Sequence, residues 1–291
     1  MRKKFLHESY GSAHEFWERN WKNAIPPGPQ VHAKLVRLMA RYLRHDMHLL
    51  EGGCGNGNYL RYFHDLGFRV TGVDFAEETV LELKRRFPEL DIRKGDITAL
   101  DFADETFDSY YSGGVIEHFQ EGPYSALAEA HRVLRNGGFL FVTVPHENWI
   151  RQISNRLVDQ TVSRDLNGRL AMEKKMPTGF IVEGNIGEFR FHEHFFTTRE
   201  MRQFLRGAGF GIVEEACIST AWGLRDWRAF RTAAALDRQD RSLLNKIVGK
   251  AFDLTDWIDS QDWAPVTALS SLQSNLFGNL KLYICRAEKS R

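Results

Sequence analysis

The residues with the clearest chemical potential form a glycine-rich loop followed by two acidic positions. The loop runs from Glu51 to Gly57 and follows a short apolar run, and Asp74 and Asp96 each end a later apolar run. Glycines let a backbone approach a ligand at positions where a Cβ would clash. Three acidic side chains at one edge of a sheet suit a positively charged nucleoside better than an anionic pyrophosphate.

The spacing of the glycines excludes the common phosphate-binding loops. A dinucleotide fingerprint needs glycine at its first, third and sixth positions, but counting from Gly53 the sixth position is Asn58, and counting from Gly55 it is Leu60. The loop also lacks the Gly-Lys-Ser/Thr ending of a nucleotide triphosphate loop. What it does fit is the pattern acidic-x-Gly-x-Gly-x-Gly, with one acid near the end of each of the next two predicted strands.

These residues need a scaffold that brings strand ends together. Between residues 47 and 145, short apolar runs alternate with helical periodicity, which predicts an α/β fold with a parallel sheet covered by helices. The predicted strands are 47–50, 68–73, 90–94, 107–112 and 139–144. Ligands bind at the carboxyl ends of the strands in such sheets. The loop and both acids are therefore expected at one crevice.

The remaining sequence is expected to add to this core. We predict an N-terminal helical cap over 1–46, the core at 47–145, a lid insert over 146–196 and a helical insertion over 219–278. Segments 197–218 and 279–287 complete the sheet with a sixth and a seventh strand, the last one antiparallel. Thr197 and Glu200 have the spacing of a capping box, which predicts the start of a helix.

Composition excludes several classes of protein. With 39 basic and 38 acidic residues, the formal charge is +1, which argues against a broad surface for nucleic acid or anionic membrane. The longest apolar run, Phe139 to Val144, is too short to span a bilayer. The three cysteines have no close metal-ligand spacing. We therefore expect a cytoplasmic globular protein without a membrane span.

Several short motifs extend the pattern of the loop. They are Val73-Asp74-Phe75, Gly95-Asp96-Ile97, Ser112-Gly113-Gly114-Val115-Ile116-Glu117-His118 and Leu134-Arg135-Asn136-Gly137-Gly138. With the glycine loop, they resemble a Rossmann-like, seven-stranded class I S-adenosylmethionine-dependent methyltransferase. The later segments 194–197 and 208–210 resemble the ubiquinone/menaquinone-biosynthesis type. Asn136 departs from the family, which often has proline there.

The resemblance implies S-adenosyl-L-methionine as cofactor and a set of residues that would hold it. In the family, the glycines line the methionine and ribose, the acid after the second strand binds the ribose hydroxyls, and the Asp-Ile pair contacts the adenine. Glu51 would support the amino group, and Ser112 or Gly113 would offer it a carbonyl. The implied cofactor residues are Tyr10, Glu51, Gly53, Cys54, Gly55, Gly57, Asp74, Phe75, Asp96, Ile97, Ser112 and Gly113.

Catalysis would need little beyond positioning. An in-line methyl transfer from a sulfonium needs a general base only if the acceptor holds a proton that it does not lose readily. The candidate bases are His118, His146 and His194, since histidine titrates near neutral pH. His192 and His194, with Glu147 or Glu188, could also suggest a metal site, but two histidines without a fixed third ligand are weak evidence and we expect no metal.

The acceptor is expected to be a small molecule with a flat or apolar body. All seven tryptophans lie outside residues 48–145, and Trp21, Trp149, Trp222 or Trp227 could line its pocket. The basic stretches at 84–86 and 225–241 contain or adjoin acidic residues, which favours solvated helix faces over a nucleic-acid site.

The sequence is compatible with three alternative functions. They are a cofactor-binding regulatory protein without catalysis, a nucleic-acid methyltransferase and, disfavoured by the glycine spacing, a nicotinamide-dependent oxidoreductase. The sequence leaves open the methylated atom (O, N or C) and the oligomeric state.

Overall fold

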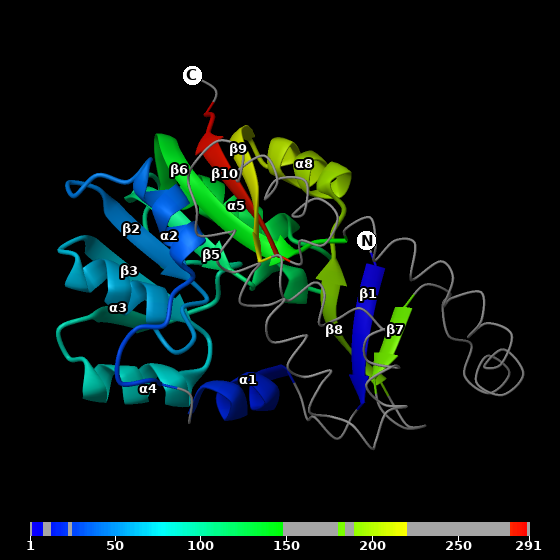
Figure 1. Cartoon of the computed structure of the whole chain (residues 1–291), viewed down its shortest axis with the longest axis horizontal. Helices are drawn as coiled ribbons and strands as arrows, with labels where there is room; N and C mark the ends of the chain where they lie inside the picture. The colour runs from blue at the N-terminus through cyan, green and yellow to red at the C-terminus, as the bar shows by residue number, and fades with distance from the viewer. Residues whose placement is uncertain are drawn as a thin grey trace, which may run out of the picture.

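The computed structural model describes residues 2–7, 13–22, 25–147, 180–183, 189–219 and 280–289. Its main element is a seven-stranded sheet in the order β4-β3-β2-β5-β6-β10-β9 (Figure 1). The strands are β2 (His48–Gly52), β3 (Arg69–Asp74), β4 (Asp91–Lys94), β5 (Phe107–Gly113), β6 (Leu134–Pro145), β9 (Phe210–Ser219) and β10 (Leu280–Ala287). Strands β2 to β6 pair in parallel, and β10 is antiparallel to both of its neighbours. The predicted sheet, with its antiparallel last strand, is confirmed.

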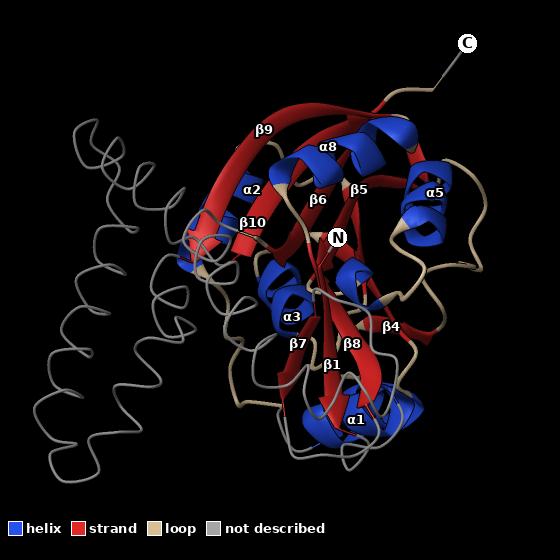
Figure 2. Ribbon diagram, turned by 90° about the vertical axis from the view of Figure 1, so that its right-hand side faces the viewer, coloured by secondary structure: helices blue, strands red, loops and turns tan. Residues whose placement is uncertain are grey.

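Helices cover both faces of this sheet (Figure 2). The described helices are α1 (Ala13–Lys22), α2 (Ala33–Ala40), α3 (Asn58–Asp65), α4 (Glu77–Arg86), the short 3-10 helix η2 (Ile116–His118), α5 (Tyr124–Val133) and α8 (Thr198–Gly207). Residues of α5 and α8 join one hydrophobic cluster, and residues of α2, α3 and α4 join the other. Successive residues of a strand point to opposite faces. Accordingly, Leu140 and Val142 of β6 belong to the first cluster and Phe141 to the second, which explains the unbroken apolar run.

A second, three-stranded sheet joins the N-terminus to the predicted lid. It has the order β7-β1-β8, with β1 (Arg2–His7) parallel to β7 (Phe180–Glu183) and antiparallel to β8 (Phe189–Phe195). The N-terminal cap over 1–46 was expected to be helical, and α1 and α2 agree, but residues 2–7 form a strand instead. Strand formation depends on pairing partners, and those of β1 lie more than 170 residues further along the chain. The predicted insertion over 219–278 lies outside the described residues except for Ser219.

The helix α8 begins as the capping box predicts. The Thr197 side chain accepts a hydrogen bond from the Glu200 backbone N–H, and the Glu200 carboxylate accepts one from the Thr197 N–H at 2.9 Å. This pair satisfies two backbone donors that would otherwise lack partners at the start of the helix.

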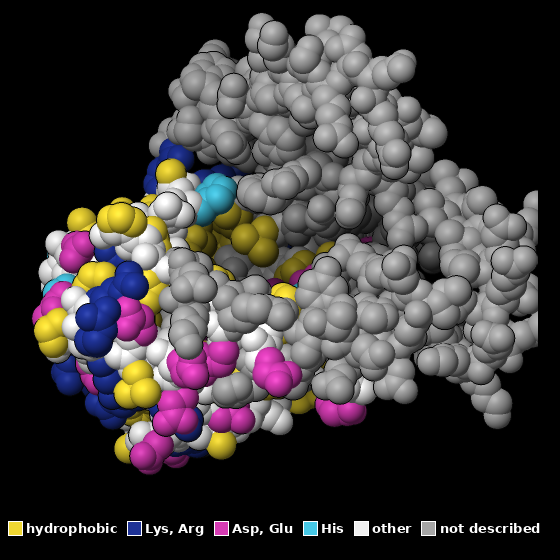
Figure 3. All heavy atoms as spheres, turned by 90° about the horizontal axis from the view of Figure 1, so that it is seen from below, with side chains coloured by type: hydrophobic (Ala, Val, Ile, Leu, Met, Phe, Trp, Pro, Cys, Tyr) yellow, Lys and Arg dark blue, Asp and Glu magenta, His cyan; other side chains and the backbone are white. Residues whose placement is uncertain are grey.

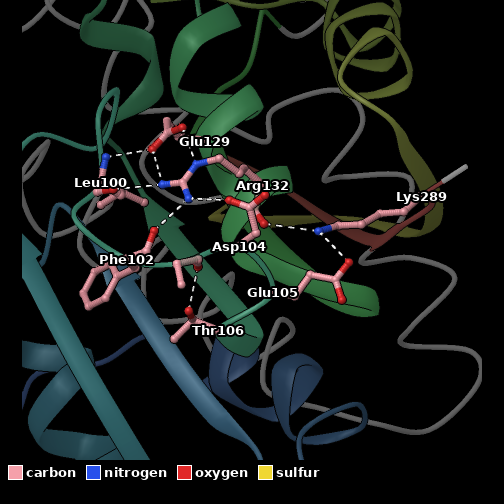
Figure 4. Close-up of polar contacts among 9 residues, drawn as sticks. Leu100, Phe102, Asp104, Glu105, Thr106, Glu129, Arg132 and Lys289 are labelled. Atoms are coloured by element: carbon pink, nitrogen blue, oxygen red, sulfur yellow. Dashed lines mark hydrogen bonds and ion pairs between the residues drawn. The ribbon is translucent and has the colours of Figure 1, made fainter.

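An arginine of α5 anchors the loop that follows β4. Arg132 donates to the carbonyl oxygens of Leu100 at 2.9 Å and Phe102 at 2.7 Å, and to the Asp104 carboxylate at 2.8 Å (Figure 4). Glu129, one turn earlier on α5, accepts from the Leu100 N–H at 2.7 Å. These contacts tie residues 100–104 to the sheet's helical layer, and this loop begins at Asp96.

The face seen in Figure 3 has mixed charge. On the face shown in Figure 3, the described Lys and Arg side chains lie among Asp and Glu side chains, and hydrophobic side chains lie in a recess. Among the described helices, none has the length and apolar composition that a bilayer crossing requires.

Candidate functional site

A cavity of about 280 Å³ lies at the carboxyl ends of the central strands. Six of the residues predicted to hold a cofactor line it, although they come from four separate stretches of the chain: Gly53, Asp74, Phe75, Asp96, Ile97 and Gly113. Trp17, Trp21 and His118 also contribute to its wall. The sheet therefore places these six predicted cofactor residues around one cavity, as expected for residues at the strand ends of a parallel sheet.

The glycine loop is held in a shape that other residues would not adopt. Gly53 and Gly55 have φ angles of +76° and +48°, in the left-handed region that favours glycine. A Cβ on Gly53 would overlap the methyl groups of Val115, and one on Gly55 would lie 3.0 Å from the Trp21 ring. The Gly53 N–H donates to the Val73 carbonyl at 2.8 Å, which fixes the loop against the end of β3.

Asp74 is the centre of this arrangement. Its side chain is buried, and its two carboxylate oxygens accept hydrogen bonds from Gly55 N–H at 2.7 Å and Ala76 N–H at 2.9 Å. Burial raises its pKa, against the lowering effect of these two hydrogen bonds. A carboxylate offers about four lone-pair sites. Each oxygen can therefore still accept a hydroxyl from a ligand in the cavity.

Asp96 and Ile97 form the neighbouring wall. One oxygen of Asp96 accepts from the backbone N–H and the hydroxyl of Thr98, both at 2.8 Å, which leaves the second oxygen for other donors. Ile97 is buried, whereas Phe75 on the opposite loop is 40% exposed. This part of the cavity combines an acceptor with apolar surface, the combination that an adenine ring requires.

The other residues predicted to hold the cofactor are not part of the described cavity lining. Glu51 and Cys54 are buried, and burial raises the pKa of each side chain well above its usual range. One Glu51 carboxyl oxygen and the Ser112 hydroxyl have no hydrogen-bond partner among the described residues. Gly57 begins α3 with a φ of +71°. Tyr10 lies outside the described residues.

The charges of this region fit a cationic adenosine derivative. Asp74 is one of the causes that raise the Glu51 pKa, so the two buried carboxyl groups repel each other when ionised. A positive charge nearby would relieve that repulsion. The residues present thus fit S-adenosylmethionine, whose sulfonium is positively charged.

Helix α1 covers the cavity with two tryptophans. Trp17 and Trp21 are stacked with ring centroids 5.5 Å apart. Glu18, between them, accepts from the Glu78 N–H at 3.0 Å and so caps the start of α4. This contact holds α1 beside α4 (Figure 1).

The three candidate histidines lie in different surroundings. His118 lines the cavity, and its Nδ1 lies 2.7 Å from the His192 carbonyl oxygen. His146 and His194 are buried outside that lining, with Nε2 3.2 Å from the Thr198 hydroxyl and from the Gln120 carbonyl, respectively. Catalytic roles for all three stay predictions.

Sequence reasoning missed several residues of the site. Trp17, Val115 and Phe119 line the cavity without having been predicted to do so. Glu117 is 2% exposed, and one of its carboxyl oxygens has no hydrogen-bond partner among the described residues. Burial raises its pKa well above the usual range, and nearby Glu193 adds to that effect. The Ile116-Glu117-His118 motif was the available signal for this acid.

Comparison with known proteins places the fold in the class I methyltransferases. A crystal structure of a SAM-dependent methyltransferase from Methanosarcina mazei has a TM-score of 0.54 and 17% identity, covering 87% of this chain and 98% of that one. Residues 50–142 match the family model described as a methyltransferase domain.

Sequence relatives establish the family. The ubiquinone/menaquinone biosynthesis C-methyltransferase of Paracoccus denitrificans is 32% identical over 185 residues, which cover 59% of this chain and 69% of the relative. The demethylmenaquinone methyltransferase of Renibacterium salmoninarum is 37% identical over 94 residues, 32% of this chain and 39% of the relative. This chain belongs to the class I S-adenosylmethionine-dependent methyltransferases. It spans about half the length of several curated relatives that it matches.

Proposed function

We propose that this protein transfers a methyl group from S-adenosylmethionine to an oxygen, nitrogen or carbon of a small-molecule acceptor. The observation that carries the proposal is that Gly53, Asp74, Phe75, Asp96, Ile97 and Gly113 all line one cavity. All six lie within residues 50–142, the segment that matches the methyltransferase-domain family model. The cofactor, when bound, supplies the methyl group on a sulfonium.

The residues of the chain would bind and orient the reactants. Asp74 accepts the ribose hydroxyls, and Asp96 and Ile97 hold the adenine. The glycine loop allows the backbone to approach the methionine portion. Such fixed geometry can lower the activation free energy by several kcal/mol, since the reacting atoms are held in line.

The acceptor side favours a flat or apolar body. Trp17, Val115 and Phe119 add apolar side chains to the lining of the cavity, and two relatives are named for menaquinone or ubiquinone synthesis. Of the three candidate histidines, His118 is the one on the cavity wall. Where an acceptor must lose a proton, a base role therefore falls to His118 in the described part of the chain.

Two measurements on the full chain test the proposal. Calorimetry with S-adenosylmethionine and S-adenosylhomocysteine should show binding of about one equivalent of each. A screen of phenols, quinols, amines and short RNAs, with release of S-adenosylhomocysteine and product mass as readouts, should then identify a methylated small molecule. Absence of binding would refute the cofactor assignment. Binding without turnover of any acceptor would favour a regulatory protein, and turnover of RNA alone would favour a nucleic-acid methyltransferase.

A further inference from the structure

Three potential metal ligands meet beside the cofactor cavity. One donor atom each from His118, His192 and Glu193 lies within 4.8 Å of the other two. His118 belongs to η2 after β5, whereas His192 and Glu193 belong to β8 in the small sheet. His118 also lines the cavity, so this group of three, the His118–His192–Glu193 cluster, adjoins the proposed methyl-transfer site.

An irregularity in β8 explains how the consecutive residues His192 and Glu193 can both belong to the cluster. In a regular strand, neighbouring side chains point to opposite faces. Here Lys4 of β1 pairs with Glu193 and Phe5 pairs with Phe191, so His192 is an extra residue at a β-bulge. Bulges re-aim side chains and are frequent next to active sites. The bulge also separates His192 from His194, which is buried against the Gln120 carbonyl instead of joining the cluster.

The hydrogen bond of His118 prepares it as a ligand. Its Nδ1 lies 2.7 Å from the His192 carbonyl oxygen, and a carbonyl oxygen can only accept. The proton of a neutral His118 ring is therefore on Nδ1, and Nε2 presents a lone pair. Metal-binding histidines commonly show this arrangement, with the second ring nitrogen donating to a backbone carbonyl.

We propose that the His118–His192–Glu193 cluster binds a divalent transition-metal ion that holds a hydroxyl oxygen of the acceptor. Two imidazoles and one carboxylate suit Zn²⁺, Co²⁺ or Fe²⁺ rather than Mg²⁺, Ca²⁺ or Mn²⁺. Three protein ligands leave coordination positions open, as in catalytic metal sites. This site differs from the expected group of His192, His194 and Glu147 or Glu188, and it runs against our expectation of no metal.

The role of the ion rests on the proposed function, and the ion replaces His118 as the group that promotes proton loss, because the Nε2 lone pair of His118 then binds the metal. A metal-bound hydroxyl loses its proton more readily than a free one. The proton passes to solvent, the oxygen attacks the methyl carbon, and the carbon–sulfur bond breaks with its electron pair going to sulfur. The products are a methyl ether, S-adenosylhomocysteine and one proton.

Metal binding can be tested without any acceptor. The full chain is stripped with a chelator and titrated with Zn²⁺ by calorimetry and with Co²⁺ by visible absorption. We expect about one equivalent of either ion and Co²⁺ bands typical of nitrogen and oxygen ligands. His192→Ala and the near-isosteric Glu193→Gln should each weaken Zn²⁺ binding by about 100-fold or more, at least the effect of losing a supporting residue. His64→Ala, which replaces a partly exposed histidine on α3, serves as the control and should leave binding unchanged.

The outcomes separate this inference from the proposed function. Absence of Zn²⁺ binding, or equal affinity in wild type, His192→Ala and Glu193→Gln, would overturn the metal site. S-adenosylhomocysteine binding measured on the same samples reports the cofactor site independently. Metal bound by a chain that does not bind S-adenosylhomocysteine would support the metal site while refuting the proposed function.

Discussion

Replacing Asp74 should affect both the stability of the folded protein and its affinity for the cofactor. In the free protein it accepts from Gly55 N–H at 2.7 Å and from Ala76 N–H at 2.9 Å. Hydrogen bonds to a charged group are each worth about 1.5–3 kcal/mol. Because burial raises the Asp74 pKa, part of this gain is already offset by desolvation. We therefore expect Asp74→Ala to lower the free energy of unfolding by about 3 kcal/mol, the low end of the sum. Asp74→Asn, which keeps one acceptor oxygen, should lose about half of that.

Cofactor affinity should fall by a free energy similar to the loss of stability. If both ribose hydroxyls donate to Asp74, its loss removes two further charge-assisted contacts of at least about 1.5 kcal/mol each. The sum of about 3 kcal/mol corresponds to an affinity about 100-fold weaker. Asp74→Asn should lie between wild type and Asp74→Ala, because the amide retains one acceptor but no charge.

The assay is calorimetry with S-adenosylhomocysteine, run well below the unfolding temperature that each variant shows in a thermal scan. Asp65→Ala is the matched control, since Asp65 is an exposed acid at the end of α3. A folded Asp74→Ala protein whose Kd stays within about threefold of wild type, less than 0.7 kcal/mol, would refute the ribose assignment.

Three further substitutions test the loop after β4, the glycine loop and a histidine of β2. Arg132→Met removes the contacts to Leu100, Phe102 and Asp104. It should lower the free energy of unfolding in urea by about 2 kcal/mol and weaken S-adenosylhomocysteine binding. Normal affinity in this variant would show that Arg132 is not needed to position the loop. Gly53→Ala should weaken cofactor binding because its Cβ would overlap Val115, and Gly53→Ala with Val115→Ala should recover part of the loss in calorimetry. Burial and the charge of Arg69 lower the pKa of His48 from 6.5 to about 4. The unfolded chain thus binds more protons between these values, and stability should fall by about 1–2 kcal/mol as pH drops through that window, after discounting for partial exposure. In urea unfolding, the His48→Gln variant should not show this pH-dependent loss of stability.

The core of the site could be predicted because its determinants are local in the sequence. Each of Gly53, Asp74, Asp96 and Gly113 lies at or just after the end of a parallel strand, and such ends meet at one edge. The strands themselves are visible as apolar runs, since residues such as Phe141 and Val142 of β6 are buried on opposite faces.

The covering elements could not be predicted because they depend on distant contacts. Trp17 reaches the cavity because Glu18 caps α4 sixty residues further along the chain. Strand β1 forms because β7 and β8 pair with it. The bulge at His192 is likewise a property of that pairing, so the alternation of faces along the sequence does not reveal it.

The charge of the cavity leads to a last prediction, on proton release. Burial, with a contribution from Asp74, raises the Glu51 pKa well above its usual range, which favours the protonated acid in the free protein. A bound cation lowers the pKa of a neighbouring carboxyl group. Binding of cationic S-adenosylmethionine should therefore release more protons than binding of S-adenosylhomocysteine, which lacks the sulfonium charge. Calorimetry in two buffers of different ionisation enthalpy measures this difference, and Glu51→Gln should abolish it. If the binding enthalpies of both compounds depend equally on the buffer in wild type, the sulfonium charge does not change the protonation of Glu51.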